Sequence, residues 1–149
     1  MPAMKHKKMN SNFRCYSELI TLPTFKKRFN YLKLNGAVGE STFGFDRYIN
    51  QKFYRTSEWK NIRRQIILRD FGCDLACTDR EIPQGVRIII HHMNPMDVND
   101  IIHKQDWILD PEFLICTTKR THDAIHYGDE SILYDEPISR FPGDTCLWK

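Results

Sequence analysis

The stretch VRIIIHHMNP, residues 86–95, carries a run of aliphatic side chains into two adjacent histidines and an Asn-Pro break. The β-branched residues favour a strand, which we predict over Val86–Ile90. Successive side chains of a strand point to opposite faces, so His91 and His92 are expected to have different roles. These residues alone favour the simpler interpretation, a strand that has reached solvent at an Asn-Pro turn. The rest of the chain has to decide between these two interpretations.

The composition is that of an ordinary soluble globular protein. With 149 residues and 41% hydrophobic content, the chain can form one domain with a modest core. No run approaches the roughly 18 apolar residues of a membrane span, and the first twelve residues lack the apolar segment of a signal peptide. Five irregularly spaced cysteines give poor evidence for a disulfide framework and favour a reducing cytoplasm. We therefore expect a cytoplasmic protein without membrane association.

The net charge of +3 is unevenly distributed along the chain. The segment YRTSEWKNIRRQIILR, residues 54–69, contains five basic residues and one acidic residue. Ser57 can cap a helix from Glu58 to about Arg69, with Trp59 and Ile66 on an apolar stripe and most basic residues opposite. Such a cationic face suggests a polyanion as partner, although a simply solvated face carries the same pattern.

The order of the predicted elements indicates an α+β fold. The basic helix is followed by the strand Val86–Ile90, a loop, a second strand over Phe113–Thr117 and a final helix. We divide the chain into four segments: a basic, disordered arm (1–16), an N-terminal helical region (17–56), a core (57–128) and an irregular C-terminal tail (129–149).

A second pair of histidines lies in TTKRTHDAIHYG, residues 117–128, where we predict a helix over Lys119–Tyr127 that Gly128 closes. His122 and His126 are four residues apart and share one face of that helix. This spacing is common in helices that bind no metal. With a third imidazole from His91, however, the set could hold one ion and leave a coordination position open, as catalytic sites do. His92, on the other face of the strand, would then be free to act as a base.

These motifs resemble those of the HNH, or ββα-metal, nucleases. The pattern IIIHHMNP followed by LDPEFLICTTKRTHDAIHYG is similar to that family, and the pair HH with TTKRTHDAIH looks like the nuclease colicins. The segments SELITLPTFKKRFNYLKLNG and FGFDRYINQKFYRTSEWKNIRRQIILRDFGCDLA are similar to the small HNH endonucleases of tailed bacteriophages. The resemblance covers roughly residues 17–133. It implies a ββα-metal core in which His91, His122 and His126 bind the metal and His92 is the general base.

The resemblance also implies a function. It points to a phage-encoded, metal-dependent DNA endonuclease that uses one divalent ion (Zn, Ni, Mn or Mg) and leaves 5′-phosphate and 3′-hydroxyl ends. Its substrate would be double-stranded DNA, and its setting genome packaging with terminase and portal in the bacterial cytoplasm. The basic residues expected to contact phosphates are Arg63, Arg64, Lys119 and Arg120. The alternatives are a metal-stabilised DNA-binding module without catalysis, and a phage morphogenesis protein with purely structural histidines.

The chain departs from the family pattern at two places. The asparagine that usually pins the loop between the two strands is replaced by Phe113. Many members also hold a structural zinc with two C-x-x-C pairs, whereas Cys73 and Cys77 are separated by three residues and Thr118 and Thr121 stand where the second pair would be. Four thiolates cannot be assembled there, so we predict no structural zinc.

Overall fold

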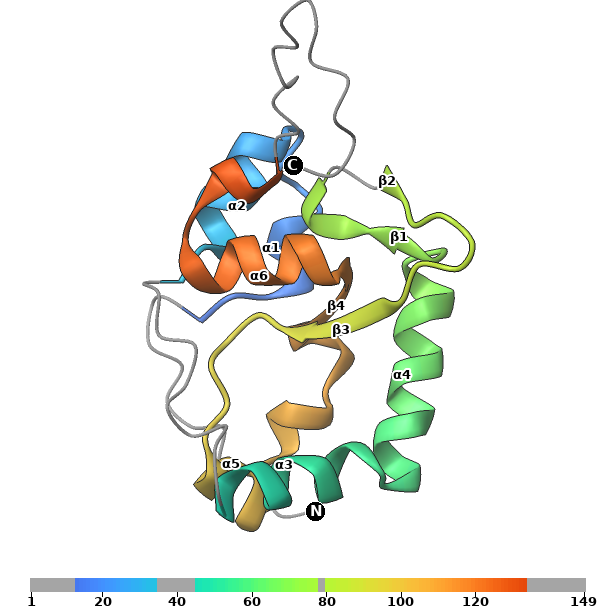
Figure 1. Ribbon diagram of the computed structural model, residues 1–149, viewed down its shortest axis with the longest axis vertical. Coiled ribbons are helices and arrows are strands. Elements are labelled where there is room, and N and C mark those ends of the chain that lie inside the picture. Colours follow the sequence, from blue (N-terminus) through green and yellow to red (C-terminus); the bar gives the residue numbers. More distant parts are fainter. Residues whose placement is uncertain (1–12, 35–44, 78–79, 134–149) are drawn as a thin grey trace, which may run out of the picture.

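The computed structural model describes residues 13–34, 45–77 and 80–133. Within these ranges the fold is α+β, with six α-helices and two small antiparallel sheets (Figure 1). The helices are α1 (Tyr16–Leu19), α2 (Phe25–Leu32), α3 (Phe45–Tyr54), α4 (Ser57–Arg69), α5 (Val98–Ile102) and α6 (Lys119–Tyr127). The strands are β1 (Cys73–Asp74), β2 (Arg80–Glu81), β3 (Ile88–His92) and β4 (Leu114–Thr118). No helix in these ranges is long and apolar enough to cross a membrane.

The hairpin β3–β4 lies at the centre of the molecule, between α6 and the end where α3 and α5 meet (Figure 1). Its register places His91 opposite Ile115 and His92 opposite Leu114. The predicted strand over Val86–Ile90 is therefore shifted by two residues, because pairing with β4 continues through both histidines. β4 in turn leads directly into α6, so the two strands and the helix are consecutive apart from one long loop.

Helix α6 has the bounds predicted from the sequence. Thr118 caps its start, because its side-chain oxygen accepts a hydrogen bond from the Thr121 N–H. Gly128 ends it with a φ of 65°, a left-handed conformation that favours glycine. A Cβ at this position would also lie 2.6 Å from the carbonyl oxygen of Leu34. The end at Gly128 is thus fixed by the residue that predicted it, and the structure adds Thr118 as the N-cap.

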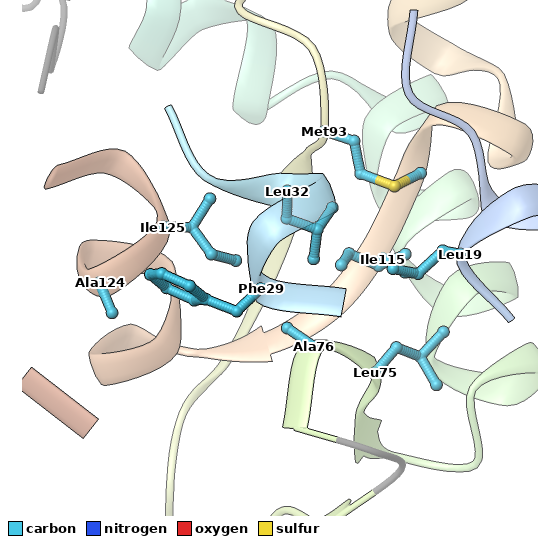
Figure 2. Close-up of a cluster of buried hydrophobic side chains, with 9 residues drawn as sticks. All are labelled: Leu19, Phe29, Leu32, Leu75, Ala76, Met93, Ile115, Ala124 and Ile125. Carbon is cyan, nitrogen blue, oxygen red and sulfur yellow. The ribbon is translucent and has the colours of Figure 1, made fainter. Parts of the chain in front are cut away.

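One hydrophobic cluster packs α6 and β4 against α1 and α2 (Figure 2). Its buried members are Leu19, Phe29, Leu32, Leu75, Ala76, Met93, Ile115, Ala124 and Ile125. Helix α6 contributes Ala124 and Ile125, which lie between His122 and His126 in the sequence and on a different face of the helix. Burial of this face fixes the rotation of α6 about its axis and leaves His122 and His126 on the side that looks toward β3.

A second cluster covers the other face of the hairpin. It consists of Phe53, Trp59, Ile66, Ile90, Ile108, Leu114 and Cys116. Helix α4 supplies Trp59 and Ile66, as its apolar stripe predicts. Its N-cap is Thr56 rather than the predicted Ser57, because the Thr56 hydroxyl accepts from the Trp59 N–H at 3.2 Å. Both residue types cap helices well, so the sequence does not separate them.

Residues 13–16 differ from the disordered arm predicted for residues 1–16. Phe13 packs edge-on against Phe113, and the guanidinium of Arg14 donates to the carbonyl oxygen of Tyr31 at 2.7 Å. These long-range contacts hold a segment whose own composition gives no sign of order. Residues 1–12 of the predicted arm and residues 134–149 of the predicted tail lie outside the described residues.

Candidate metal centre

Three histidines converge between β3 and α6. One ligand atom from each of His91, His122 and His126 lies within 4.8 Å of the other two. The ring of His91 is 5.2 Å from each of the other two rings and nearly perpendicular to both. Strand alternation and the i,i+4 spacing on a helix predicted this set, and the structure brings all three of its members together.

The spacing of the nitrogens suits one metal ion. The Nε2 atoms of His122 and His126 are 3.0 Å apart. Two imidazole nitrogens at 2.0–2.1 Å from a common ion, at angles between octahedral and tetrahedral, would be about 2.8–3.4 Å apart. The helix pair is therefore already close to the separation that coordination requires.

His91 gives the strongest indication of a metal. Its side chain is 1% exposed, yet neither ring nitrogen has a hydrogen-bond partner within the described residues. The Nδ1 atom of His126 is also buried without a partner there. A buried polar group without a partner destabilises the fold by about 1–3 kcal/mol. An ion held by these rings would satisfy one nitrogen of His91 and so remove part of that penalty.

The electrostatics keep the three rings in the form that binds metals. Burial lowers the pKa of His91 well below its ordinary value, and the neighbouring His122 and His126 lower it further. Burial likewise lowers the pKa of His126 to about 4. The pKa of His122 is also lowered by burial, although Asp123 opposes the shift. Three neutral imidazoles are thus available at neutral pH, and a metal requires this protonation state.

Asp123 can orient His122. Its Oδ1 atom lies 3.5 Å from Nδ1 of His122, at the long limit of a hydrogen bond, and its Oδ2 atom accepts from the ammonium of Lys119. A proton on Nδ1 would leave Nε2 of His122, the atom that faces His126, with its lone pair. A carboxylate behind a histidine is a common way to fix the tautomer of a metal ligand.

A buried polar network fixes the residues just before His122. Asp74, 2% exposed, accepts a hydrogen bond from the Thr118 N–H at 3.2 Å. The Thr118 hydroxyl lies 3.1 Å from that of Thr121, which in turn lies 3.5 Å from the Cys77 thiol. Thr118 and Thr121 stand where a second C-x-x-C pair would hold zinc in the family that the sequence resembles. Here Asp74, Thr118 and Thr121 join β1, β4 and α6 by hydrogen bonds.

His92 points to the opposite face of β3, as strand alternation predicts. Its ring stacks on Trp59, with 5.3 Å between centroids and 15° between planes. Its Nε2 atom lies 2.9 Å from the carbonyl oxygen of Ile108. Because a carbonyl oxygen only accepts hydrogen bonds, Nε2 must carry the proton. The Nδ1 atom then holds the lone pair and can accept a proton from another molecule.

Burial also lowers the pKa of His92 to about 4. The hydrogen bond to the Ile108 carbonyl opposes this shift, because it raises the pKa. Positive charge on a protonated His122 would lower the pKa further. The arrangement therefore combines a set of metal ligands on one face of a strand with a neutral, oriented imidazole at the end of the same strand.

The four predicted DNA-contacting residues have different surroundings. Arg64 is exposed on α4, and Lys119 is exposed and paired with Asp123. Arg63 is half-buried and donates to the carbonyl oxygen of Ile88 at 3.0 Å, and Arg120 donates to that of Ile132 at 2.8 Å. Arg64 and Lys119 are thus the better placed of the four to meet a polyanion, while Arg63 and Arg120 also serve the fold.

Sequence reasoning missed the Ile108 carbonyl, because a backbone acceptor leaves no signal in the side-chain pattern. It also missed Asp123, although the position of this carboxylate next to His122 could have suggested it.

Comparison with protein-family models, curated proteins and solved structures finds no match for this chain.

Proposed function

We propose that this protein is a metal-dependent DNA endonuclease of the HNH type. In this proposal His91, His122 and His126 hold one divalent ion, Zn, Ni, Mn or Mg, and His92 is the general base. The observation that carries it is the buried imidazole of His91, which has no hydrogen-bond partner among the described residues and lies beside the His122–His126 pair. A fourth histidine with a defined tautomer at the next position of the strand supports catalysis rather than a purely structural metal.

Each group has a defined task in the hydrolysis. A divalent ion on the three imidazoles would supply positive charge to a phosphate oxygen and to the leaving 3′ oxygen. The Nδ1 atom of His92 takes a proton from water, whose oxygen forms the new bond to phosphorus as the bond to the 3′ oxygen breaks. The Ile108 carbonyl holds Nε2–H and stabilises the imidazolium that forms. The stack on Trp59 keeps the ring from turning.

Two exposed cations favour a polyanionic substrate. Arg64 and Lys119 would contact phosphates, which contributes affinity but carries no sequence information. A phage enzyme that acts with terminase and portal in the bacterial cytoplasm is the biological setting that the sequence resemblance supports.

Plasmid cleavage tests the proposal. Supercoiled plasmid is incubated with Mg, Mn, Ni or Zn and with wild-type protein, His92→Ala or His103→Ala. His103 is an exposed histidine at the end of α5 and serves as the matched control. We expect the wild type and His103→Ala to convert the plasmid to nicked or linear form, and His92→Ala to do so at least about 100-fold more slowly. Equal cleavage by all three proteins would refute the assignment of the base.

One observation favours a second candidate, a metal-stabilised DNA-binding module without catalytic activity. Burial makes His92 a weak base by lowering its pKa to about 4. General bases usually titrate closer to the working pH. This candidate predicts salt-dependent DNA binding and no nicking with any of the four metals, together with loss of stability on chelation.

A further inference from the structure

The loop between β3 and β4, residues 93–113, aligns His92 through one backbone atom. The Ile108 carbonyl that binds Nε2 of His92 belongs to the 3₁₀ turn Asp106–Leu109 within this loop. The carbonyl is 16 residues beyond His92, so its position depends on what holds the loop. The orientation of the His92 ring is therefore determined by the 93–113 loop and not by β3, the strand that carries it.

The first described residues of the chain hold the start of this loop. Asn94 is 4% exposed, and its side chain makes two hydrogen bonds to the backbone of Arg14. Its Oδ1 atom accepts from the Arg14 N–H and its Nδ2 atom donates to the Arg14 carbonyl, both at 2.8 Å. Arg14 is itself anchored, because its guanidinium donates to the carbonyl oxygens of Tyr31 and Lys33. The start of the loop is thereby tied to α2 through Arg14.

Phe13 holds the other end of the same loop. Its ring packs edge-on against Trp107 and Phe113, at centroid distances of 5.6 and 4.9 Å. Trp107 immediately precedes Ile108, and its ring is 6.5 Å from that of His92 and nearly perpendicular to it. Phe13 is therefore one side chain away from the proposed base.

We propose that Phe13 and Asn94 are positioning residues of the nuclease site: with Arg14 they lock the 93–113 loop so that the Ile108 carbonyl keeps His92 in its reactive tautomer. In this chain the loop is held by a segment about eighty residues away rather than by an asparagine at position 113. Phe113, buried in the place of that asparagine, provides the surface on which Phe13 rests. The inference rests on the proposed function, since the aim of His92 matters only if the ring accepts a proton.

The lock should affect catalysis without affecting metal binding. Phe13 contacts Trp107 and Phe113, and Asn94 contacts Arg14. His122 and His126 lie on α6, to which neither side chain bonds in these contacts. In Phe13→Ala and Asn94→Leu we therefore expect kcat for plasmid cleavage to fall about 10- to 100-fold. KM and the affinity for Zn, measured by calorimetry, should stay as in the wild type.

Phe25→Ala is the matched control, because Phe25 is equally half-buried but its ring contacts Phe29 on α2. A loss of kcat in Phe25→Ala equal to that in Phe13→Ala would overturn the inference, because general destabilisation would then explain both. A parallel loss of Zn affinity in Phe13→Ala or Asn94→Leu would overturn it as well.

A spectroscopic readout separates this inference from the proposed function. In metal-free protein, two-bond ¹H–¹⁵N correlation spectra report which nitrogen of His92 carries the proton. We expect wild type and Phe25→Ala to show a protonated Nε2 and a bare Nδ1, and the two loop variants to show averaged nitrogen shifts. Retention of the wild-type pattern in both loop variants would overturn the lock. A wild-type protein that cuts no DNA would instead refute the nuclease proposal, and the spectra would still decide whether the lock exists.

Discussion

Acidification of the metal-free protein should remove a substantial part of its stability, because the folded chain buries neutral histidines. Burial lowers the pKa of His92 and that of His126 to about 4, whereas an unfolded histidine titrates near pH 6.5. At about pH 5.5 the unfolded chain therefore binds protons at these two positions and the folded chain does not. Stability should fall as the pH drops through about 6.5 and level off only near pH 4.

The size of the effect follows from proton linkage. Between about pH 7.5 and pH 5.5 each of the two histidines should lower the free energy of unfolding by about 1.4 kcal/mol, or about 3 kcal/mol together. His91 acts in the same direction, since burial lowers its pKa as well. Asp74 acts in the opposite direction, since burial raises the pKa of its carboxyl. The expected loss is large against the 5–15 kcal/mol that is typical of folded domains.

Urea unfolding in the presence of EDTA, followed by tryptophan fluorescence, measures this loss at the two pH values. In His126→Gln the pH dependence should shrink by about 1.4 kcal/mol, whereas in His103→Ala, which changes an exposed ring, it should be unchanged. A wild-type free energy of unfolding that is the same at both pH values would show that buried neutral histidines do not set the pH dependence. A His126→Gln variant with the full pH dependence of the wild type would show that His126 does not contribute to it.

Substitutions at four further positions probe the polar network before His122, the end of α6 and the basic residues of α4. Thr121→Val removes one hydroxyl of the network before His122 and should weaken Zn binding about 10-fold or more. Thr121→Ser keeps the hydroxyl, and its Zn affinity should stay near that of the wild type. Equal Zn affinities of the two variants in calorimetry would show that the network does not position the helix. Gly128→Ala should lower the free energy of unfolding by about 1–3 kcal/mol, because its φ is 65° and its Cβ would meet the Leu34 carbonyl oxygen; an unchanged urea midpoint would contradict this. Arg64→Gln should reduce the slope of log DNA affinity against log salt concentration by about one unit without loss of stability. Arg63→Gln should also destabilise the fold, since Arg63 donates to the Ile88 carbonyl. Identical stability of the two variants would argue against that difference.

The elements that carry the histidines were predictable because their signals are local. Thr118 and Gly128 mark the ends of α6, and the four-residue spacing of His122 and His126 puts both rings on one face. Alternation along β3 separated His91 from His92 correctly. Local periodicity and capping chemistry thus predicted the position of the cluster as well as its members.

What could not be predicted depends on distant or backbone groups. The Ile108 carbonyl has no signature in the sequence, and the contact between Arg14 and Asn94 joins residues 80 positions apart. The polar character of the first residues favoured a disordered arm, but burial of Phe13 against Trp107 and Phe113 outweighs that tendency. Arg63 looked like part of a cationic face, and only the tertiary structure places its guanidinium against β3.

In the proposed metal site, one ion is bound by His91, His122 and His126. Anomalous diffraction from crystals of the full chain grown with Zn tests it most directly. We expect a single strong peak between β3 and α6, with one nitrogen of each histidine at about 2.0–2.1 Å from the ion. A Zn-saturated crystal with no ion at this place, and with the ring nitrogens of His91 still without a metal, would contradict it.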